Sequence, residues 1–249
     1  MIENKDINND DSLEKLLILE EAKRLKTIFL DNMSHELRTP ITVILGYAGI
    51  LYEEIKDPDL KEMAEIILKS SNRLTEALNL LLDQSDVASE RLKVELKEEN
   101  LCDFLKETYN VYKPITEDKG LILNYNNKLD FAKCSIDRKM FTKVSNNLLN
   151  NAIKFTEKGS ITITLDMDSE KKFYIIDFED TGIGIAEDKL SLIFEAFRQV
   201  SEGMNRIYQG IGLGLSVSKK FVELMNGDLT VKSTPNVGTT FTIKIPTIN

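Results

Sequence analysis

Two long amphipathic helical patterns at the start of the chain, separated by a short turn, constrain the fold more than any other feature. The first begins near Ser12, a candidate N-cap, and runs to about Ile55. The second follows the turn Lys56-Asp57-Pro58-Asp59, and its apolar positions step by four and three as in a heptad repeat, interrupted by Ser71: Leu60, Ala64, Ile67, Ser71, Leu74, Leu78 and Leu81. A single helical hairpin cannot bury both stripes, whereas two hairpins can. We therefore predict an all-α hairpin over residues 12–88 that forms a dimeric four-helix bundle, after a disordered segment 1–11. A coiled-coil spacer without chemistry is the alternative that periodicity leaves open.

After a linker near residues 85–91, the pattern changes to shorter helices and short strands. Helices are predicted from Leu101 to about Thr116 with Asn100 as the cap, from Asp137 to Phe155, and from about Leu213 to Met225. Strands are predicted at 92–96, 121–125, 161–167, 173–179, 229–233 and 239–245. Because helices and strands do not alternate strictly, residues 89–249 are expected to form an α+β sandwich with helices on one face of a mixed sheet.

The composition argues against several classes of protein. The net charge of −9 argues against nucleic-acid binding, which requires a broad basic surface. Cys102 and Cys134 lack metal-ligand spacing and make no disulfide framework. No apolar run approaches the roughly 20 residues needed to cross a bilayer, and the acidic, Asn-rich start does not resemble a signal peptide. We expect a cytoplasmic protein without membrane contact of its own, either native to the cytosol or the cytoplasmic part of a longer membrane-bound sensor.

His35 is the single histidine of the chain, so any imidazole chemistry takes place there. It falls outside the apolar stripe of the first helix, on a polar ridge with Asp31, Asn32, Arg38, Thr39 and Thr42. The adjacent carboxylate of Glu36 can accept the proton of one ring nitrogen and make the other more nucleophilic. Pro40 removes a backbone donor, so the helix is expected to bend or loosen just beyond the histidine. Taken alone, the residue also fits a surface histidine without function.

The helix that begins at Asp137 carries a second group of polar residues. Asn147 and Asn151 are four residues apart and share one face, and Lys154 lies one turn beyond. Amide oxygens are hard ligands suited to Mg²⁺, and lysine supplies a cation for phosphate oxygens. A solvated polar face is the alternative for these residues on their own.

Two glycine-rich segments complete the set of candidate site residues. Asp180-Thr181-Gly182-Ile183-Gly184-Ile185 follows an apolar strand, where glycines let the backbone approach a flat ligand and a carboxylate can accept from an exocyclic amine such as that of adenine. An ordinary glycine-rich turn is the alternative. The segment 210–216 opens a helix, so its free N–H groups form an anion site, although it is not a Walker A loop. Between the two lie Phe194, Phe197 and a polar run 198–209, which has the composition of a mobile lid.

In this order, the segments resemble the cytoplasmic core of sensor histidine kinases of two-component signalling. Residues 34–40 look like the H box, 146–156 the N box, 180–185 the first G box, 194–197 the F box, and 210–215 the second G box. The match covers nearly the whole chain from about residue 12. It implies a HisKA-type dimerisation and phosphotransfer domain followed by a HATPase domain of the Bergerat ATP-binding fold, which gyrase and heat-shock chaperone ATPases share.

The resemblance implies a role for each matching residue. His35 would be the phosphoacceptor, Glu36 its base, and Thr39 the position that orients water during dephosphorylation of the partner. Asn147 would bind Mg²⁺ and Asp180 the adenine amine. Phosphate contacts are implied for Lys154 and for Arg206 or Arg198, and the other nucleotide-binding positions are Asn151, Phe155, Gly182, Gly184, Ile185, Phe197, Gly210, Gly212, Leu213, Gly214 and Leu215. Gln209 and Ile211 depart from the small or hydroxyl residues frequent in the family.

The function that this resemblance implies is an ATP:protein-histidine phosphotransferase that requires ATP and Mg²⁺. His35 Nε2 would attack the γ-phosphoryl group, and the phosphoryl group would pass to an Asp of a separate response-regulator receiver domain. Two alternatives stay open: a phosphatase-dominant member that acts through Thr39, and a pseudokinase scaffold that only binds nucleotide and partner. A Bergerat-fold ATPase without phosphotransfer does not explain why the sole histidine lies in the hairpin.

Overall fold

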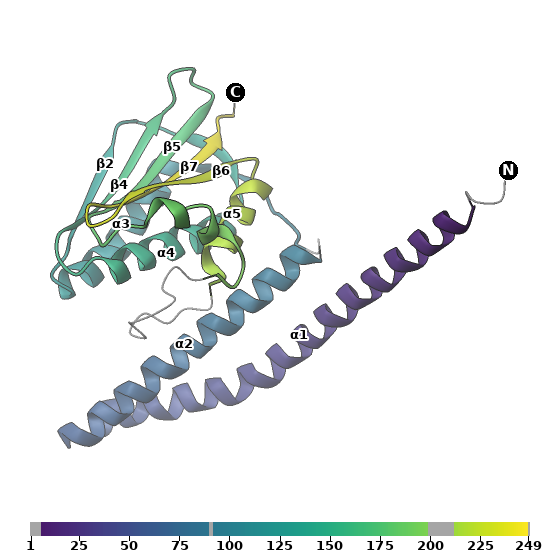
Figure 1. Ribbon diagram of the computed structural model, residues 1–249. Coiled ribbons are helices and arrows are strands. Elements are labelled where there is room, and N and C mark those ends of the chain that lie inside the picture. Colours follow the sequence, from purple (N-terminus) through teal and green to yellow (C-terminus); the bar gives the residue numbers. More distant parts are fainter. Residues whose placement is uncertain (1–5, 90–91, 199–211, 249) are drawn as a thin grey trace. The chain divides into compact units, whose positions relative to one another are not determined.

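The computed structural model describes residues 6–89, 92–198 and 212–248, without the side chains of residues 6–20, 23, 24, 26, 27, 30, 31, 34, 35 and 88. The chain divides into two compact units, Met1–Leu92 and Lys93–Asn249. The first is helical and the second is built on a β-sheet, so the expected fold class, a helical hairpin followed by an α+β domain, is confirmed (Figure 1). Among the described residues, no helix combines the length and the apolar composition that crossing a membrane requires.

The first unit is a hairpin of two long helices, α1 (Asp6–Glu54) and α2 (Pro58–Ala88). The Asp57 carboxylate accepts from the backbone N–H groups of Asp59 (3.0 Å) and Leu60 (3.1 Å), and Pro58 occupies the first turn, which explains why a new helix begins there. Helix α1 begins at Asp6, so residues 6–11 are helical and Ser12 is not its N-cap. Pro40 lies inside α1 without interrupting it.

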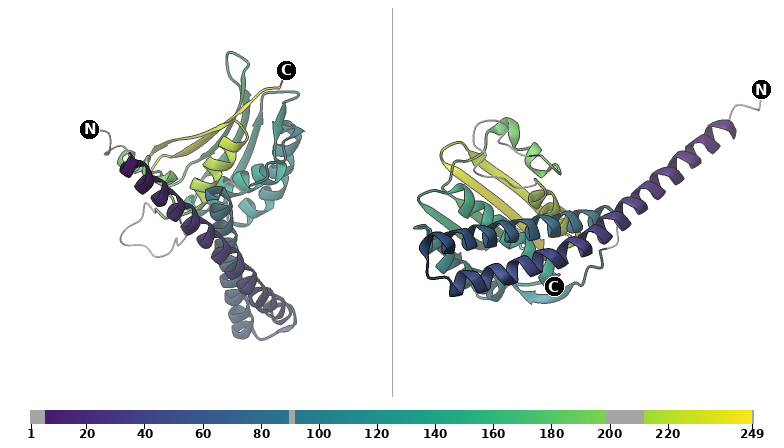
Figure 2. Two further views of the ribbon diagram at one scale, coloured as in Figure 1. Left: turned by 90° about the vertical axis from the view of Figure 1, so that its right-hand side faces the viewer. Right: turned by 90° about the horizontal axis from the view of Figure 1, so that it is seen from below.

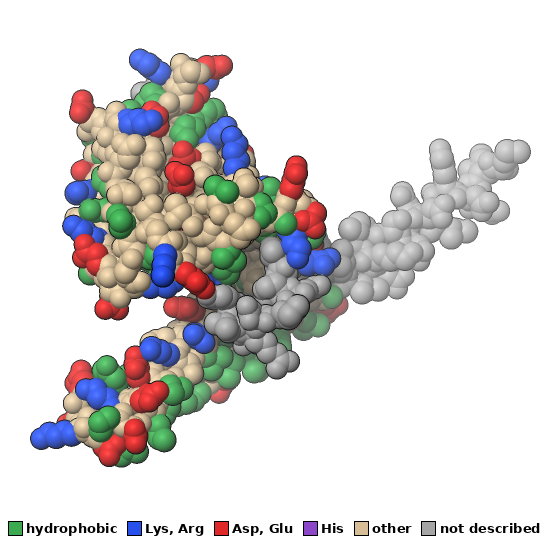
Figure 3. All heavy atoms as spheres, turned by 60° about the vertical axis from the view of Figure 1, so that its left-hand side comes forward, with side chains coloured by type: hydrophobic (Ala, Val, Ile, Leu, Met, Phe, Trp, Pro, Cys, Tyr) green, Lys and Arg blue, Asp and Glu red, His purple; other side chains and the backbone are tan. Residues whose placement is uncertain are grey.

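The heptad positions of the hairpin fall into two columns. The inner column is buried within one hairpin and has members seven residues apart on each helix: Ile41 and Ala48 on α1, and Ala64, Ser71 and Leu78 on α2. The outer column is exposed and has the same spacing: Leu37, Ile44, Leu51, Leu60, Ile67 and Leu74. Among the described side chains, one hairpin therefore buries the inner column and leaves the outer column exposed. Hydrophobic side chains accordingly remain visible along the described part of the two helices (Figure 3).

The second unit contains a five-stranded sheet in the order β2-β4-β5-β7-β6. Its strands are β2 (Ile122–Asn127), β4 (Ser160–Met167), β5 (Phe173–Asp180), β6 (Asp228–Thr234) and β7 (Gly238–Pro246). Strand β2 is parallel to β4, and the other neighbours are antiparallel. A separate antiparallel pair is formed by β1 (Lys97–Asn100) and β3 (Lys133–Ile136).

Helices α3 (Leu101–Asp118), α4 (Arg138–Phe155) and α5 (Gly214–Leu224) cover one face of the sheet (Figures 1 and 2). Alternate residues of the strands point into this layer and are buried, among them Ile161, Ile163, Ile176 and Phe178. Short 3₁₀ turns, η1 (Glu187–Lys189) and η2 (Leu192–Phe194), follow β5. The helices, capped as expected by Asn100 and Asp137, and the later strands confirm the predicted elements.

One predicted strand is wrong. Residues 92–96 are irregular, and the Glu95 N–H donates to the Asp137 carboxylate (Oδ2, 3.0 Å) rather than to a neighbouring strand. The strand lies one step later, at β1, and its partner β3 was not predicted, because four-residue strands leave almost no periodic pattern.

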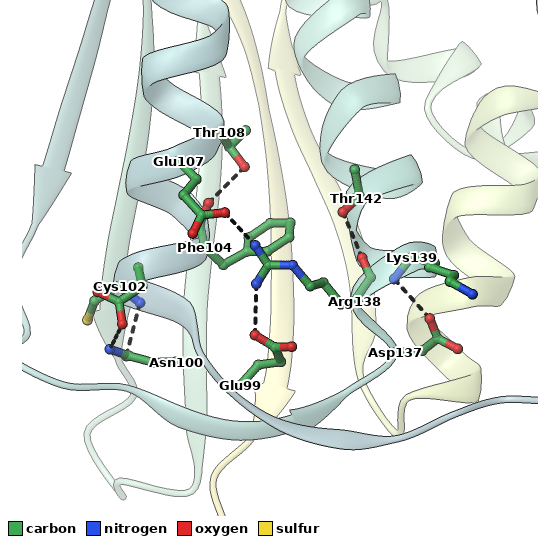
Figure 4. A network of polar contacts seen from close by, with 11 residues as sticks. Glu99, Asn100, Cys102, Phe104, Glu107, Thr108, Asp137, Arg138, Lys139 and Thr142 are labelled. Atoms are coloured by element: carbon green, nitrogen blue, oxygen red, sulfur yellow. Dashed lines mark hydrogen bonds and ion pairs between the residues drawn. The ribbon is translucent and has the colours of Figure 1, made fainter.

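The N-terminal end of α4 is held by a polar network (Figure 4). The Arg138 guanidinium pairs with Glu99 of β1 (2.8 Å) and with Glu107 of α3, and it lies 5.3 Å from the centre of the Phe104 ring. This network joins β1, α3 and α4 at the end of α4 that is distant in sequence from the predicted site residues. Cys102 and Cys134 are buried and free.

Candidate active site

The carboxylate of Asp180 lies at the end of the central strand β5 and is buried. Its Oδ1 atom accepts a hydrogen bond from the Gly182 N–H (2.8 Å). Burial raises the pKa of the Asp180 carboxyl above its ordinary value, although backbone hydrogen bonds from Gly182 and Thr239 act in the opposite direction. The Asp180 carboxylate is therefore a buried hydrogen-bond acceptor fixed at the start of the first glycine-rich segment.

The loop after Asp180 is held between the end of α4 and the β6–β7 turn. Ile183 N–H donates to the Phe155 carbonyl (3.2 Å), and a methyl group built at Gly182 would lie 2.4 Å from the same oxygen. Gly184 has φ +67°, and a methyl group there would lie 2.1 Å from the Thr234 carbonyl oxygen. Larger residues would displace the loop, which explains why glycine stands at both positions.

Two hydroxyl residues that the sequence did not single out support this loop. Ser233 Oγ accepts from the Ile185 N–H (2.8 Å), donates to the Gly238 carbonyl (2.8 Å) and lies 2.9 Å from Thr239 Oγ1. Thr239 pairs with Asp180 in the β5–β7 ladder. The strand period of β7 was visible in the sequence, but the register that brings Thr239 opposite Asp180 was not.

Helix α4 brings Asn147, Asn151 and Lys154 to the same region, all half-buried. The Lys154 ammonium lies 4.9 Å from the centre of the Phe155 ring. The last turn of the helix is capped by Lys119, whose Nζ donates to the carbonyl oxygens of Ile153 and Thr156. The cap fixes the end of α4 beside the glycine-rich loop, and it too was missed, because Lys119 is distant in sequence.

Gly212 and Leu213 lead into α5. Gly212 has φ +74°, and a methyl group there would lie 2.6 Å from the Arg198 carbonyl oxygen. The Phe197 N–H donates to the Gly212 carbonyl (2.9 Å), so the chain on either side of residues 199–211 comes together here. Leu213 is buried and supplies no side-chain cap to α5, and Gly214 and Leu215 form its first turn. Within the described residues, the backbone N–H groups of this first turn have no side-chain acceptor at the capping position.

Of the polar run 198–209, which the sequence predicts as a mobile lid, the structure describes only Arg198. Phe197 is exposed and has φ +65°, and Arg198 Nε donates to the Glu195 carboxylate (3.2 Å). Arg206, Gln209, Gly210 and Ile211 lie outside the described residues.

His35 belongs to the other compact unit, in α1, and its side chain is not among those described. Its neighbours Glu36 and Thr39 are exposed. Thr39 follows the histidine by one helical turn, so the two residues share a face of α1.

Comparison with known families matches both units. Residues 136–249 match the model of the histidine kinase-, DNA gyrase B- and HSP90-like ATPases, and residues 18–90 match that of the His Kinase A (phospho-acceptor) domain, which includes His35. The chain belongs to the histidine kinases. The autoinducer 2 sensor kinase/phosphatase LuxQ of Vibrio harveyi is 34% identical to this kinase over 91% of the chain, and the signal transduction histidine-protein kinase BarA of Escherichia coli is 37% identical over 89%. The kinase spans about a quarter of the length of these relatives, 27% of LuxQ and 25% of BarA.

Solved structures show the same fold. Full-length ShkA in complex with AMPPNP superposes with a TM-score of 0.73 at 24% identity, over 88% of this kinase and 46% of ShkA. The histidine kinase ThkA in complex with the response regulator TrrA gives a TM-score of 0.62 at 24% identity, over 92% of this kinase and 65% of the ThkA chain.

Proposed function

We propose that this chain is the catalytic core of an autophosphorylating protein histidine kinase that transfers the γ-phosphoryl group of ATP to His35. The observation that carries the proposal is that the only histidine lies in the segment matching the phospho-acceptor model, while the ATPase-like unit assembles a glycine-lined site around Asp180. The two units supply different parts of one reaction: acceptor and nucleotide.

Three features of the ATPase unit fit a bound adenine nucleotide. The buried Asp180 carboxylate would accept from the adenine amine, and the glycines at 182 and 184, which pack closely against the Phe155 and Thr234 carbonyl groups, would hold the loop backbone beside the base. The first turn of α5, which lacks a side-chain cap, would donate its N–H groups to the phosphates, because the positive end of a helix favours an anion. Lys154 would add a cation.

The donor set also fits a hard divalent cation, because Asn147 presents an amide oxygen beside Gly214, at the start of α5. Mg²⁺ bound there would neutralise charge on the phosphate oxygens. Asn151 lies one turn further along the same face of α4. We therefore propose ATP with Mg²⁺ as the substrate form.

In the proposed reaction, Glu36 accepts a hydrogen bond from one nitrogen of the His35 imidazole, so that the other nitrogen attacks the γ-phosphorus. The bond from phosphorus to the β,γ-bridging oxygen breaks and ADP leaves. The phosphoryl group then passes to an Asp of a receiver domain. The structural similarity to ThkA, whose structure contains the response regulator TrrA, supports a partner of this kind.

The outer column supports a homodimer. Its exposed apolar residues follow the heptad spacing that packs two hairpins into a four-helix bundle.

A second activity, removal of phosphate from the response regulator, is favoured by one observation. Thr39 is exposed one turn after His35, where a hydroxyl would orient a water molecule toward a docked phosphoaspartate. The name of LuxQ, a sensor kinase/phosphatase, is consistent with both activities in one protein. A Thr39→Ala variant that keeps autophosphorylation but dephosphorylates its partner more slowly would establish this activity.

The test of the main proposal is incubation of the purified chain with γ-labelled ATP and Mg²⁺. We expect protein-bound label that is labile in acid and stable in base, and no label in His35→Gln. Nucleotide binding by His35→Gln should match that of the unchanged chain, which separates loss of the acceptor from loss of folding. Label of the same stability in His35→Gln, or nucleotide binding without any label in the unchanged chain, would refute the kinase proposal.

A further inference from the structure

The amide of Asn147 lies against two residues of α5 that are one helical turn apart. Its Nδ2 atom donates to Ser218 Oγ (2.9 Å), and its Oδ1 atom lies 2.3 Å from the position that a methyl group on Gly214 would occupy. Gly214 has no side chain and so leaves room for this amide, and the Ser218 hydroxyl accepts a hydrogen bond from its nitrogen.

The hydroxyl of Ser218 receives the nitrogen end of this amide, and the oxygen end faces the start of α5. Ser218 is buried, so its oxygen is an acceptor shielded from water. Because the amide nitrogen is held by Ser218, the carbonyl oxygen is directed toward Gly214 and the first turn of α5. Without this hydrogen bond the contact that holds the amide in this orientation is lost, and the amide is free to rotate by half a turn about Cβ–Cγ and present its NH₂ group, which cannot ligate a cation.

We propose that Ser218 is a positioning residue for the cation site: it holds the Asn147 amide with Oδ1 available to the Mg²⁺ that accompanies the nucleotide. This inference rests on the proposed function, since it assigns Oδ1 to the Mg²⁺ of Mg·ATP. It also explains the glycine at position 214, because any side chain there would displace the oxygen.

The test compares nucleotide affinity with and without the metal. ADP binding is measured calorimetrically in excess Mg²⁺ and again in EDTA, for the unchanged chain, Ser218→Ala and Ser218→Thr. We expect Mg²⁺ to tighten binding by the unchanged chain, and Ser218→Ala to lose about three- to tenfold of that gain, the effect of one hydrogen bond, while its affinity in EDTA is unchanged. Ser218→Thr keeps a hydroxyl and should retain the gain.

Ser145→Ala is the matched control. Ser145 is also a buried serine, two residues before Asn147 on α4, and its hydroxyl has no hydrogen-bond partner within the described residues. This variant should keep both affinities, so that the loss of a buried hydroxyl is separated from the loss of the Asn147 contact.

Three outcomes would overturn the inference. If Ser218→Ala binds ADP more weakly by the same factor in Mg²⁺ and in EDTA, Ser218 only supports the fold. If Mg²⁺ tightens ADP binding by Ser218→Ala as much as by the unchanged chain, Ser218 does not orient the amide. If the unchanged chain binds ADP equally with and without Mg²⁺, the cation site of the proposed function fails together with this inference. Histidine labelling, which is measured separately, distinguishes that case from failure of the kinase proposal itself.

Discussion

The two units of this kinase cover their apolar side chains in different ways. The ATPase unit builds a core within one chain, in which Ile161, Ile163 and Ile176 are each 0% exposed, whereas Ile44 and Leu51 of the hairpin are each 47% exposed. A unit that completes its core within one chain has a stability independent of protein concentration. The stability of a hairpin that needs a second copy depends on protein concentration. If the hairpin dimerises as proposed, the nucleotide site and the proposed acceptor site are stabilised by two different mechanisms, and each can be disturbed without the other.

The largest effect is expected from Gly238→Ala. A methyl group there would lie 1.9 Å from the Asp180 carbonyl oxygen, which is a backbone atom of the paired strand β5 and cannot move aside as a flexible side chain could. We expect the ATPase unit to lose about 3 kcal/mol or more of its free energy of unfolding, and the helical signal of the hairpin to persist. Urea unfolding monitored by circular dichroism, together with ADP binding, measures this.

Gly120→Ala is the control for that variant. Gly120 also has positive φ, +76°, but a methyl group there would meet nothing within 4 Å. It should cost only about 1 kcal/mol, the conformational part of the effect. Equal losses in the two variants would mean that the contact with Asp180 is not what makes glycine necessary at position 238.

An intermediate effect is expected from Ile44→Asp, which places a charge in the outer column. If two hairpins bury this column, the variant should weaken dimerisation by about a hundredfold or more, because it removes a buried apolar side chain from each copy and adds a charge. Sedimentation equilibrium measures the dimer, and ADP affinity should stay unchanged. Val43→Asp is the control, since Val43 is exposed but outside the column. A dimer that survives Ile44→Asp would place the interface elsewhere.

The smallest change in stability is expected from Asp180→Asn. Burial raises the pKa of Asp180, so the charged carboxylate is disfavoured in the folded unit compared with the unfolded chain. The stabilisation from this group is complete at acid pH and is lost as the pH rises through its folded pKa. Asp180→Asn should therefore increase the melting temperature at neutral pH and flatten its pH dependence. It should also weaken ADP binding about tenfold, because the charged acceptor is lost.

The control for Asp180→Asn is a carboxylate whose pKa is shifted in the opposite direction. A hydrogen bond from Lys128 lowers the pKa of Asp166, so Asp166→Asn should slightly lower the melting temperature at neutral pH and leave ADP binding unchanged. If Asp180→Asn also lowers the melting temperature, the carboxylate contributes more to the fold than its burial costs.

Much of the fold could be predicted because its signals are local. The caps Asn100 and Asp137 each precede a helix whose apolar period is clear, and the two glycine-rich segments stand out by composition. The heptad pattern also identified the hairpin, but it could not say which column one hairpin buries, since both columns have the same period.

The features that were missed depend on contacts between distant parts of the chain. Ser218 acquires a partner only when α5 packs beside α4, and Lys119 caps a helix that ends more than thirty residues later. The β1–β3 pair has the same origin, because each strand is too short to be recognised without the other. Sequence pattern thus locates the candidate nucleotide-binding residues, whereas tertiary packing determines which residues hold them in place.

The position of β7 has a consequence for synthesis on the ribosome. This strand is translated after β6 but pairs between β5 and β6, and it supplies Gly238 and Thr239 beside Asp180. A nascent polypeptide that has emerged only through β6 already carries Asp180 and the glycine-rich loops, yet the edge of β5 is still open. Translation must therefore proceed through β7 before the proposed nucleotide site is complete, so an interrupted translation product would carry the proposed phosphoacceptor, His35, without the complete site that is proposed to phosphorylate it.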